Sequence, residues 1–110
     1  MASFPIRLTT TTRAVLDLFM QARAAGGAAE RLWGYRICED TGLGSGTVYP
    51  ILERLLEAGL ITATWEDPLP ADRPPRRFYV LTDNGAAAYA VALAARPRRR
   101  ASFIPRRNPA

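Results

Sequence analysis

The chain has 110 residues, of which 48% are hydrophobic, and a formal net charge of +5. A chain of this length buries one modest core, so we expect a single small domain that gains stability by pairing with a second copy. One cysteine and no histidine exclude a disulfide framework and the usual zinc sites, and they remove the commonest general base. The composition therefore argues against an enzyme and predicts neither a metal nor another cofactor.

The chain also lacks the marks of a membrane or secreted protein. No apolar run reaches the roughly 18 residues of a membrane-spanning helix. Residues 1–8 contain no continuous hydrophobic stretch of the kind found in a secretory signal. We therefore expect a cytoplasmic protein that has no membrane partner.

The positive charge is unevenly distributed. Every basic residue is an arginine, and six of the 15 lie after Ala95, where there is no acid. The preceding part has nine arginines against ten acidic residues. A folded domain over 1–95 followed by a flexible Arg/Pro-rich tail over 96–110 is the organisation that this pattern predicts. Any affinity of the domain for nucleic acid must come from a few placed arginines.

The first predicted helix spans Thr10 to Ala25 and ends at Gly26-Gly27. Val15, Leu18, Phe19 and Ala22 form its core stripe at helical spacing. Leu16 and Met20 lie on a flank that we expect to face a partner subunit.

A helix-turn-helix follows. Leu32 to Thr41 is a short segment with helical periodicity, and Gly42-Leu43-Gly44 separates it from a second helix that Gly59 ends. Ser45 or Thr47 is the expected N-cap of this second helix. Its packing face carries Val48, Ile51, Leu52 and Leu55. Its opposite face carries Thr47, Pro50, Glu53, Arg54 and Glu57, which are placed to meet a partner.

Two strands and a last helix complete the domain. The runs Leu60 to Trp65 and Arg77 to Leu81 are rich in β-formers, and a proline-rich loop over 66–76 joins them into a hairpin with a wing. The last helix covers about residues 82–95, with Thr82 as N-cap. Phe19, Phe78 and Trp65 are expected in the core. The fold class is mainly α (α+β): a winged helix-turn-helix with three helices, a two-stranded wing and a C-terminal helix.

At this point the chain resembles the PadR-type winged-helix transcriptional regulators, in a short form without an added C-terminal helical domain. The residues that carry the resemblance are Gly34-Tyr35, most of 45–55, 57–61, Trp65-Glu66, 73–79 and 81–85. Together they cover about half of the chain in the right order. The wing departs from the family pattern, since Asp72 stands where glycine is usual and Pro75 looks inserted.

The resemblance implies a sequence-specific regulator of transcription, a repressor that binds duplex DNA as a homodimer. The helix residues expected at the DNA are Ser45, Thr47, Tyr49, Pro50 and Arg54, with the hydroxyl of Tyr49 on a phosphate and Arg54 in the major groove. The wing residues expected at the DNA are Arg73, Arg76 and Arg77. Each assignment has a structural alternative: a partly buried flank position for Tyr49, an ion pair with Glu53, Glu57 or an acid of the preceding helix for Arg54, and solvated loop charge for the wing arginines.

Dimerisation is implied through the first and last helices, with Leu16 and Met20 facing Tyr89 and Leu93. The resemblance also suggests a small hydrophobic or aromatic effector, as in some relatives. Trp33 and Trp65 could stack on such a ligand, although core packing is the alternative for both. Two other functions stay open. The winged helix could be a protein-interaction module, or the domain could be a scaffold for a basic tail that binds RNA or a membrane surface.

Overall fold

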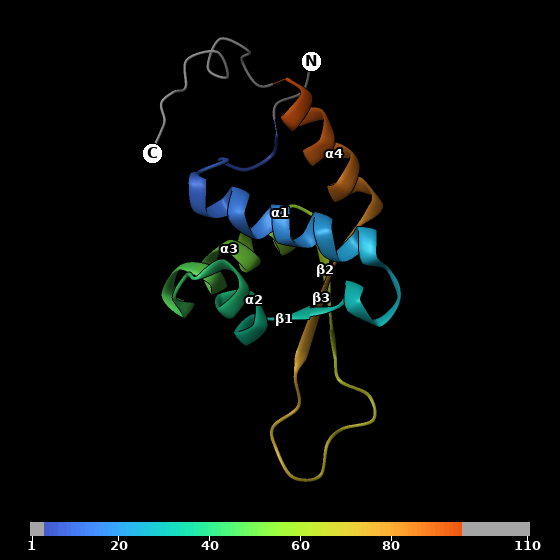
Figure 1. Cartoon of the computed structure of the whole chain (residues 1–110). Helices are drawn as coiled ribbons and strands as arrows, with labels where there is room; N and C mark the ends of the chain where they lie inside the picture. Colours follow the sequence, from blue (N-terminus) through green and yellow to red (C-terminus); the bar gives the residue numbers. More distant parts are fainter. Residues whose placement is uncertain (1–3, 96–110) are drawn as a thin grey trace, which may run out of the picture.

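The computed structural model describes residues 4–95, so the predicted arginine-rich tail lies outside the described residues. Over this range the chain is mixed α and β, as predicted (Figure 1). Its elements are, in order, α1 (Thr10–Ala25), the 3-10 helix η1 (Gly27–Glu30), β1 (Leu32–Trp33), α2 (Gly34–Thr41), α3 (Ser45–Glu57), β2 (Ile61–Trp65), β3 (Arg77–Leu81) and α4 (Asp83–Ala94).

Helix α1 has the predicted bounds because both of its ends are fixed locally. The hydroxyl of Thr9 accepts a hydrogen bond from the backbone N–H of Thr12 at 3.1 Å, which caps the first turn. Gly26 ends the helix with a φ of +69°, a conformation that L side chains rarely adopt. The face between these ends buries Val15, Phe19 and Ala22.

Helices α2 and α3 are joined by the predicted glycine turn, in which Gly42 is left-handed. The N-cap prediction is wrong, because the cap of α3 is Gly44 and Ser45 is already helical. The carbonyl of Gly44 accepts from the N–H groups of Thr47 and Val48 at 3.0 Å each, so the backbone alone starts the helix.

The end of α3 is as predicted. Gly59 is left-handed, with φ of +74°, and its N–H donates to the carbonyl of Leu56 at 3.0 Å. The N–H of Leu60 donates to the carbonyl of Leu55 at 2.9 Å. This pair of bonds is a Schellman motif, which satisfies the last carbonyls and directs the chain into β2.

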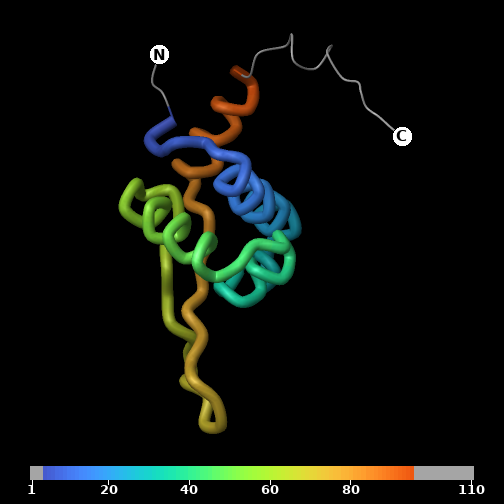
Figure 2. Tube along the Cα trace, turned by 90° about the vertical axis from the view of Figure 1, so that its left-hand side faces the viewer, coloured from blue at the N-terminus to red at the C-terminus, as the bar shows by residue number. Residues whose placement is uncertain are grey.

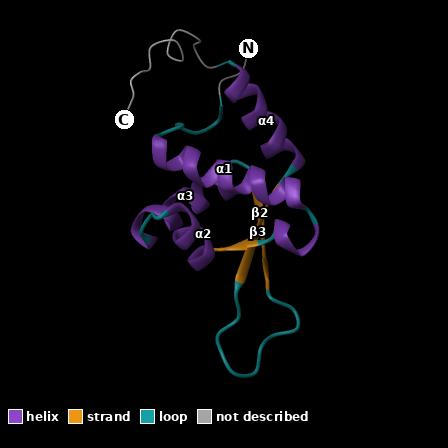
Figure 3. Cartoon of the chain, in the orientation of Figure 1, coloured by secondary structure: helices purple, strands orange, loops and turns teal. Residues whose placement is uncertain are grey.

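The sheet has three antiparallel strands in the order β1-β3-β2. The predicted hairpin is present, with Ile61 opposite Leu81 and Trp65 opposite Arg77, and its loop extends well beyond the helical part of the chain (Figures 2 and 3). Strand β1 was not predicted. It pairs Leu32 with Tyr79 and Trp33 with Phe78, so the residue before α2 is fixed to the base of the wing.

The core lies between α1, α3 and the inner face of the sheet. It includes Phe19, as predicted, and Phe78 is also buried. The prediction for Trp65 is wrong, because its side chain is 60% exposed at the base of the wing. Leu16 is a second correction. It is fully buried among core residues, so it cannot lie on a flank that faces a partner.

Helix α4 packs on the side of α1 away from the sheet (Figure 1). The hydroxyl of Thr82 caps it by accepting from the N–H of Gly85 at 2.9 Å, as predicted. Tyr89 is fully buried within the protomer: its ring meets Phe4, and its hydroxyl donates to the carboxylate of Asp17 at 2.7 Å. Tyr89 therefore holds α4 to its own chain and offers no surface to a second one.

Candidate nucleic-acid interface

Helix α3 divides into the two faces that its sequence predicts. Val48, Ile51, Leu52 and Leu55 are buried against the core. The residues expected at a partner are all exposed; they are Ser45, Thr47, Tyr49, Pro50 and Arg54. The helix thus presents a small polar surface of hydroxyls and one guanidinium, with the exposed carboxylates of Glu53 and Glu57 on the same face.

Arg54 is the cation of that surface. An ion pair with Glu53, Glu57 or an acid of α2 was the alternative, and none of these is formed among residues 4–95. Glu53 lies nearest to Arg77, with Oε2 4.0 Å from Nη1. Within residues 4–95 the guanidinium of Arg54 makes no hydrogen bond or ion pair, which leaves all of its donors for a ligand.

Tyr49 lies on the side of α3 that faces the start of α2. Its side chain is 44% exposed, so it is not a buried flank residue. Its ring occupies the space above Gly34: a Cβ at that glycine would lie 2.1 Å from the Tyr49 hydroxyl oxygen. The absence of a side chain at position 34 is therefore what allows Tyr49 its place.

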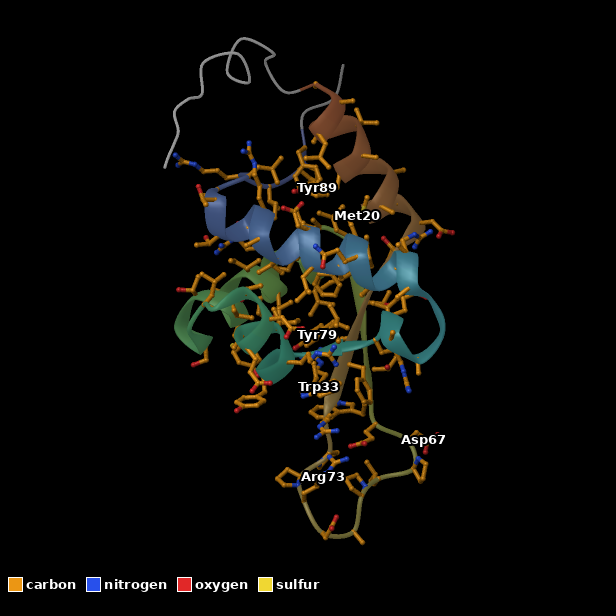
Figure 4. All side chains as sticks on the ribbon, in the orientation of Figure 1. Met20, Trp33, Asp67, Arg73, Tyr79 and Tyr89 are labelled. Atoms are coloured by element: carbon orange, nitrogen blue, oxygen red, sulfur yellow. The ribbon has the colours of Figure 1, made fainter. Side chains whose placement is uncertain are left out.

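A groove of about 570 Å³ separates α3 from the base of the wing. Its aromatic lining comes from Trp33, Tyr35, Tyr49, Trp65 and Tyr79. Its charged lining comes from Glu53, Arg76 and Arg77. Figure 4 shows Trp33 beside the base of the wing, below Tyr79. Burial raises the pKa of the Tyr79 phenol, which therefore stays protonated and neutral at physiological pH.

The three wing arginines differ in their surroundings, although the sequence predicted the same role for all of them. Arg73 donates two hydrogen bonds to Glu66, and this contact lowers the pKa of the Glu66 carboxyl to about 2. Arg76 lies over the ring of Trp33, with Cζ 4.5 Å from the ring centroid. Arg77 lies 5.7 Å from the ring of Tyr79. The charge of Arg73 is thus already neutralised, while Arg76 and Arg77 are held at the groove.

Sequence reasoning missed part of this site. Tyr35 was not predicted at any site, and Trp33 and Trp65 were considered only as stacking partners of an effector, yet all three line the groove beside Tyr49. The available signal was the position of Trp33 directly before Gly34. A lone aromatic residue in a periodic segment is usually part of a core, so that signal is weak.

The described residues offer little to other kinds of site. Among residues 4–95, no group of three acidic or cysteine side chains could hold a metal ion. In the same range, none of the helices combines the length and the apolar composition needed to cross a bilayer.

Known structures share this fold. A PadR family transcription regulator from hypervirulent Clostridium difficile superposes with a TM-score of 0.62 at 18% identity, over 78% of this chain and 85% of that one. A PadR family regulator from Eggerthella lenta gives a TM-score of 0.58 at 26% identity, over 77% of this chain and 74% of that one. A putative DNA-binding protein from Ralstonia eutropha gives 0.58 at 23% identity, over 77% of this chain and 98% of that one. No curated protein matches the chain.

The sequence also matches a known family. The model of the transcriptional regulator PadR-like family aligns with residues 30–91, more than half of the chain. This range contains α2, α3, the complete hairpin and most of α4, which includes the polar face of α3 and the groove. The chain therefore belongs to the transcriptional regulator PadR-like family, and it is a DNA-binding regulator of transcription rather than an enzyme.

Proposed function

We propose that this regulator represses transcription by binding a specific duplex operator as a homodimer. The observation that supports specific recognition is the exposed face of α3, where Arg54 has no partner within residues 4–95. A recognition helix in the major groove reads base edges with such side chains, and arginine pairs with the O6 and N7 atoms of guanine. Ser45, Thr47 and Pro50 lie around the first turns of the same face and approach the bases with it.

The DNA backbone that borders this major groove passes between α3 and the wing. Tyr49, Arg76 and Arg77 all line the protein groove between those elements, which supports a role for them in holding the backbone. Hydroxyls and guanidinium forks are common donors to phosphate oxygens. Arg73 contributes by holding the wing, since Glu66 already occupies its donors.

The homodimer forms around α4. Val91 is 58% exposed on this helix, and Leu93 and Met20 are only partly buried. A two-fold axis at this surface would place two α3 helices on two half-sites of a pseudo-palindromic operator. Occupation of an operator that overlaps a promoter is sufficient for repression.

A small hydrophobic effector of this regulator would bind in the same groove of the protein. Its volume lies within the usual range of about 300–1,000 Å³ for ligand pockets, and Trp33 and Trp65 both line it. Since the groove also receives the DNA backbone in this proposal, such a ligand would compete with the operator.

Selection of bound duplexes from a random DNA pool tests the proposal. The parent protein should enrich a two-half-site sequence. Arg54→Ala should weaken binding to that sequence by roughly 1–3 kcal/mol, with a much smaller change for an unrelated duplex. Arg7→Ala is the matched control, because Arg7 is exposed in the segment before α1 and far from α3 in the chain.

Three results would contradict the proposal. Equal affinity of the parent for all duplexes would favour the protein-interaction module. An affinity that resides entirely in residues 96–110 would favour the scaffold for a basic tail. Unchanged operator affinity in Arg54→Ala would remove Arg54 from the site.

A further inference from the structure

A row of stacked cations and rings crosses the base of the wing. The Cζ atom of Arg31 lies 4.7 Å from the centroid of the Phe78 ring. Phe78 meets Trp33 edge to face, with ring centroids 5.8 Å apart. Arg76 lies over the other ring of this pair, 4.5 Å from the centroid of Trp33. We call these four residues the cation–aromatic row.

The pairing of β1 with β3 produces this row. Trp33 lies opposite Phe78, so the two rings lie on one face of the sheet. Their neighbours Leu32 and Tyr79 also pair and point to the other face, where both are buried. Arg31 and Arg76 are each two residues from a ring of the row, and alternation in extended chain directs them to the same face as the rings.

The two arginines of the row keep their side-chain donors free, although the charge of Arg76 also interacts with the Glu66 carboxylate. Neither guanidinium forms an ion pair with a carboxylate among residues 4–95, unlike Arg36, whose Nε donates to Asp40 at 2.9 Å. A guanidinium within about 6 Å of a ring face gains a cation–π attraction and loses little hydration. The N–H donors of each guanidinium lie in its own plane and stay free. The row therefore holds two guanidinium groups in fixed positions, where each can bind a phosphate.

The row is continuous with the surface proposed for DNA. Trp33 and Arg76 line the same groove as Tyr49 of α3. From that groove the row continues across Phe78 to Arg31, which lies just before β1 and does not line the groove. A duplex whose backbone enters the groove therefore meets Arg76 first and Arg31 beyond it.

We infer that the cation–aromatic row is a second phosphate-binding surface, which holds the duplex backbone outside the bases that α3 reads. Arg31 is its distal contact, and Phe78 and Trp33 fix the two guanidinium groups. The inference rests on the proposed function, since it extends the footprint of the same bound duplex. It adds affinity that does not depend on base sequence, which a domain with nine arginines and ten acids needs.

Arg31→Ala tests the inference against Arg36→Ala as matched control. Both arginines are exposed and both contact a ring of the row, but Asp40 already neutralises Arg36. Dissociation constants for the selected operator and for an unrelated duplex are measured between about 50 and 200 mM salt, the range over which phosphate contacts are usually compared.

Loss of one phosphate contact should lower the log–log salt slope of Arg31→Ala by about 0.9. The advantage of the parent over this variant should then shrink roughly threefold across the salt range. The preference for the operator over the unrelated duplex should be unchanged. Arg36→Ala should keep the parent slope.

The possible failures are distinguishable. If Arg31→Ala has the same salt slope as the parent and still binds the operator specifically, the inference is overturned and the proposed function stands. A parent that prefers no sequence contradicts the proposed function, while the Arg31→Ala slope still decides the inference. A slope change with duplex RNA but not with duplex DNA overturns the inference as well.

A second variant tests the part played by the ring. Phe78→Leu keeps an apolar side chain at this buried position and removes the ring under Arg31. It should weaken DNA binding in the parent background and have no further effect in the Arg31→Ala background, with circular dichroism confirming the fold. Additive losses would mean that Phe78 acts through the fold and does not position Arg31.

Discussion

The guanidinium of Arg73 forms a bidentate ion pair with the carboxylate of Glu66, with Nη1 2.9 Å from Oε1 and Nη2 2.8 Å from Oε2. The same carboxylate accepts a hydrogen bond from the backbone N–H of Arg76 at 3.2 Å. These contacts tie the two ends of the wing loop together next to the last pair of the hairpin, Trp65 and Arg77. Arg73 is therefore a brace of the wing, and its charge is compensated before any DNA arrives.

Two single variants show whether Arg73 supports the wing or contacts DNA directly. The two roles predict different changes in the salt slope of DNA binding. Arg73→Ala should lower DNA affinity with little change in salt slope, because the lost charge was already paired with Glu66. Glu66→Gln should release Arg73 and steepen the slope by up to about 0.9. Salt titrations of both variants check this. A slope that flattens by that amount in Arg73→Ala would place Arg73 itself on a phosphate.

The brace should also weaken in acid. The hydrogen bonds from Arg73, together with the N–H of Arg76, lower the pKa of Glu66 from 4.5 to about 2. Because the folded pKa is the lower one, the stabilisation is fully present above pH 4.5 and is lost as the pH falls toward 2. The carboxyl carbon shift of Glu66 in an NMR titration reports this midpoint. A midpoint near 4.5 would mean that the brace does not persist in solution.

The helices were predictable because their signals are local. Thr9 and Gly26 lie at the two ends of α1, and the apolar residues between them recur at helical spacing, so Thr10–Ala25 was predicted with the observed bounds. Gly59 and Thr82 acted in the same way for the end of α3 and the start of α4. The structure confirms these helix ends, which depend mainly on residues close to them in the sequence.

Apart from the N-cap of α3, where the cap is Gly44 and not Ser45 or Thr47, the failures involve partners that are distant in sequence. Strand β1 has two residues and exists only because β3 pairs with it. Leu16 was assigned to a free flank, yet core residues from several elements cover it. Trp65 was assigned to the core, but it lies where the hairpin leaves the helices. The different surroundings of Arg73, Arg76 and Arg77 likewise depend on how the wing loop folds back.

Gly34→Ala should disturb DNA binding without unfolding the domain. The added methyl would meet the hydroxyl end of Tyr49, an exposed side chain that can move aside. Phosphate contact by that hydroxyl would then be lost. Tyr49→Phe should lower operator affinity by a similar amount, and the double variant should lose no more than either single one. Independent losses in a binding assay would show that Gly34 acts through something other than Tyr49.

We expect the dimer interface on the exposed side of α4 and not at Tyr89. Tyr89 is buried against Phe4 and Asp17 of its own chain, so Tyr89→Phe should reduce the free energy of unfolding by about 1 kcal/mol and leave the oligomeric state unchanged. Val91 is 58% exposed on the same helix. In a two-fold dimer Val91→Asp acts twice, and at about 1.5 kcal/mol or more per buried side chain it should raise the dimer dissociation constant roughly a hundredfold.

Sedimentation of the two variants, with urea unfolding as a check on stability, decides between the two sides of α4. The Val91→Asp protein should be a folded monomer that protects one half-site of the operator instead of two. A Val91→Asp protein that stays dimeric would place the interface away from this surface. A Tyr89→Phe protein that dissociates without losing stability would contradict its assignment to the protomer core, because a side chain packed inside one chain cannot control assembly without also affecting folding.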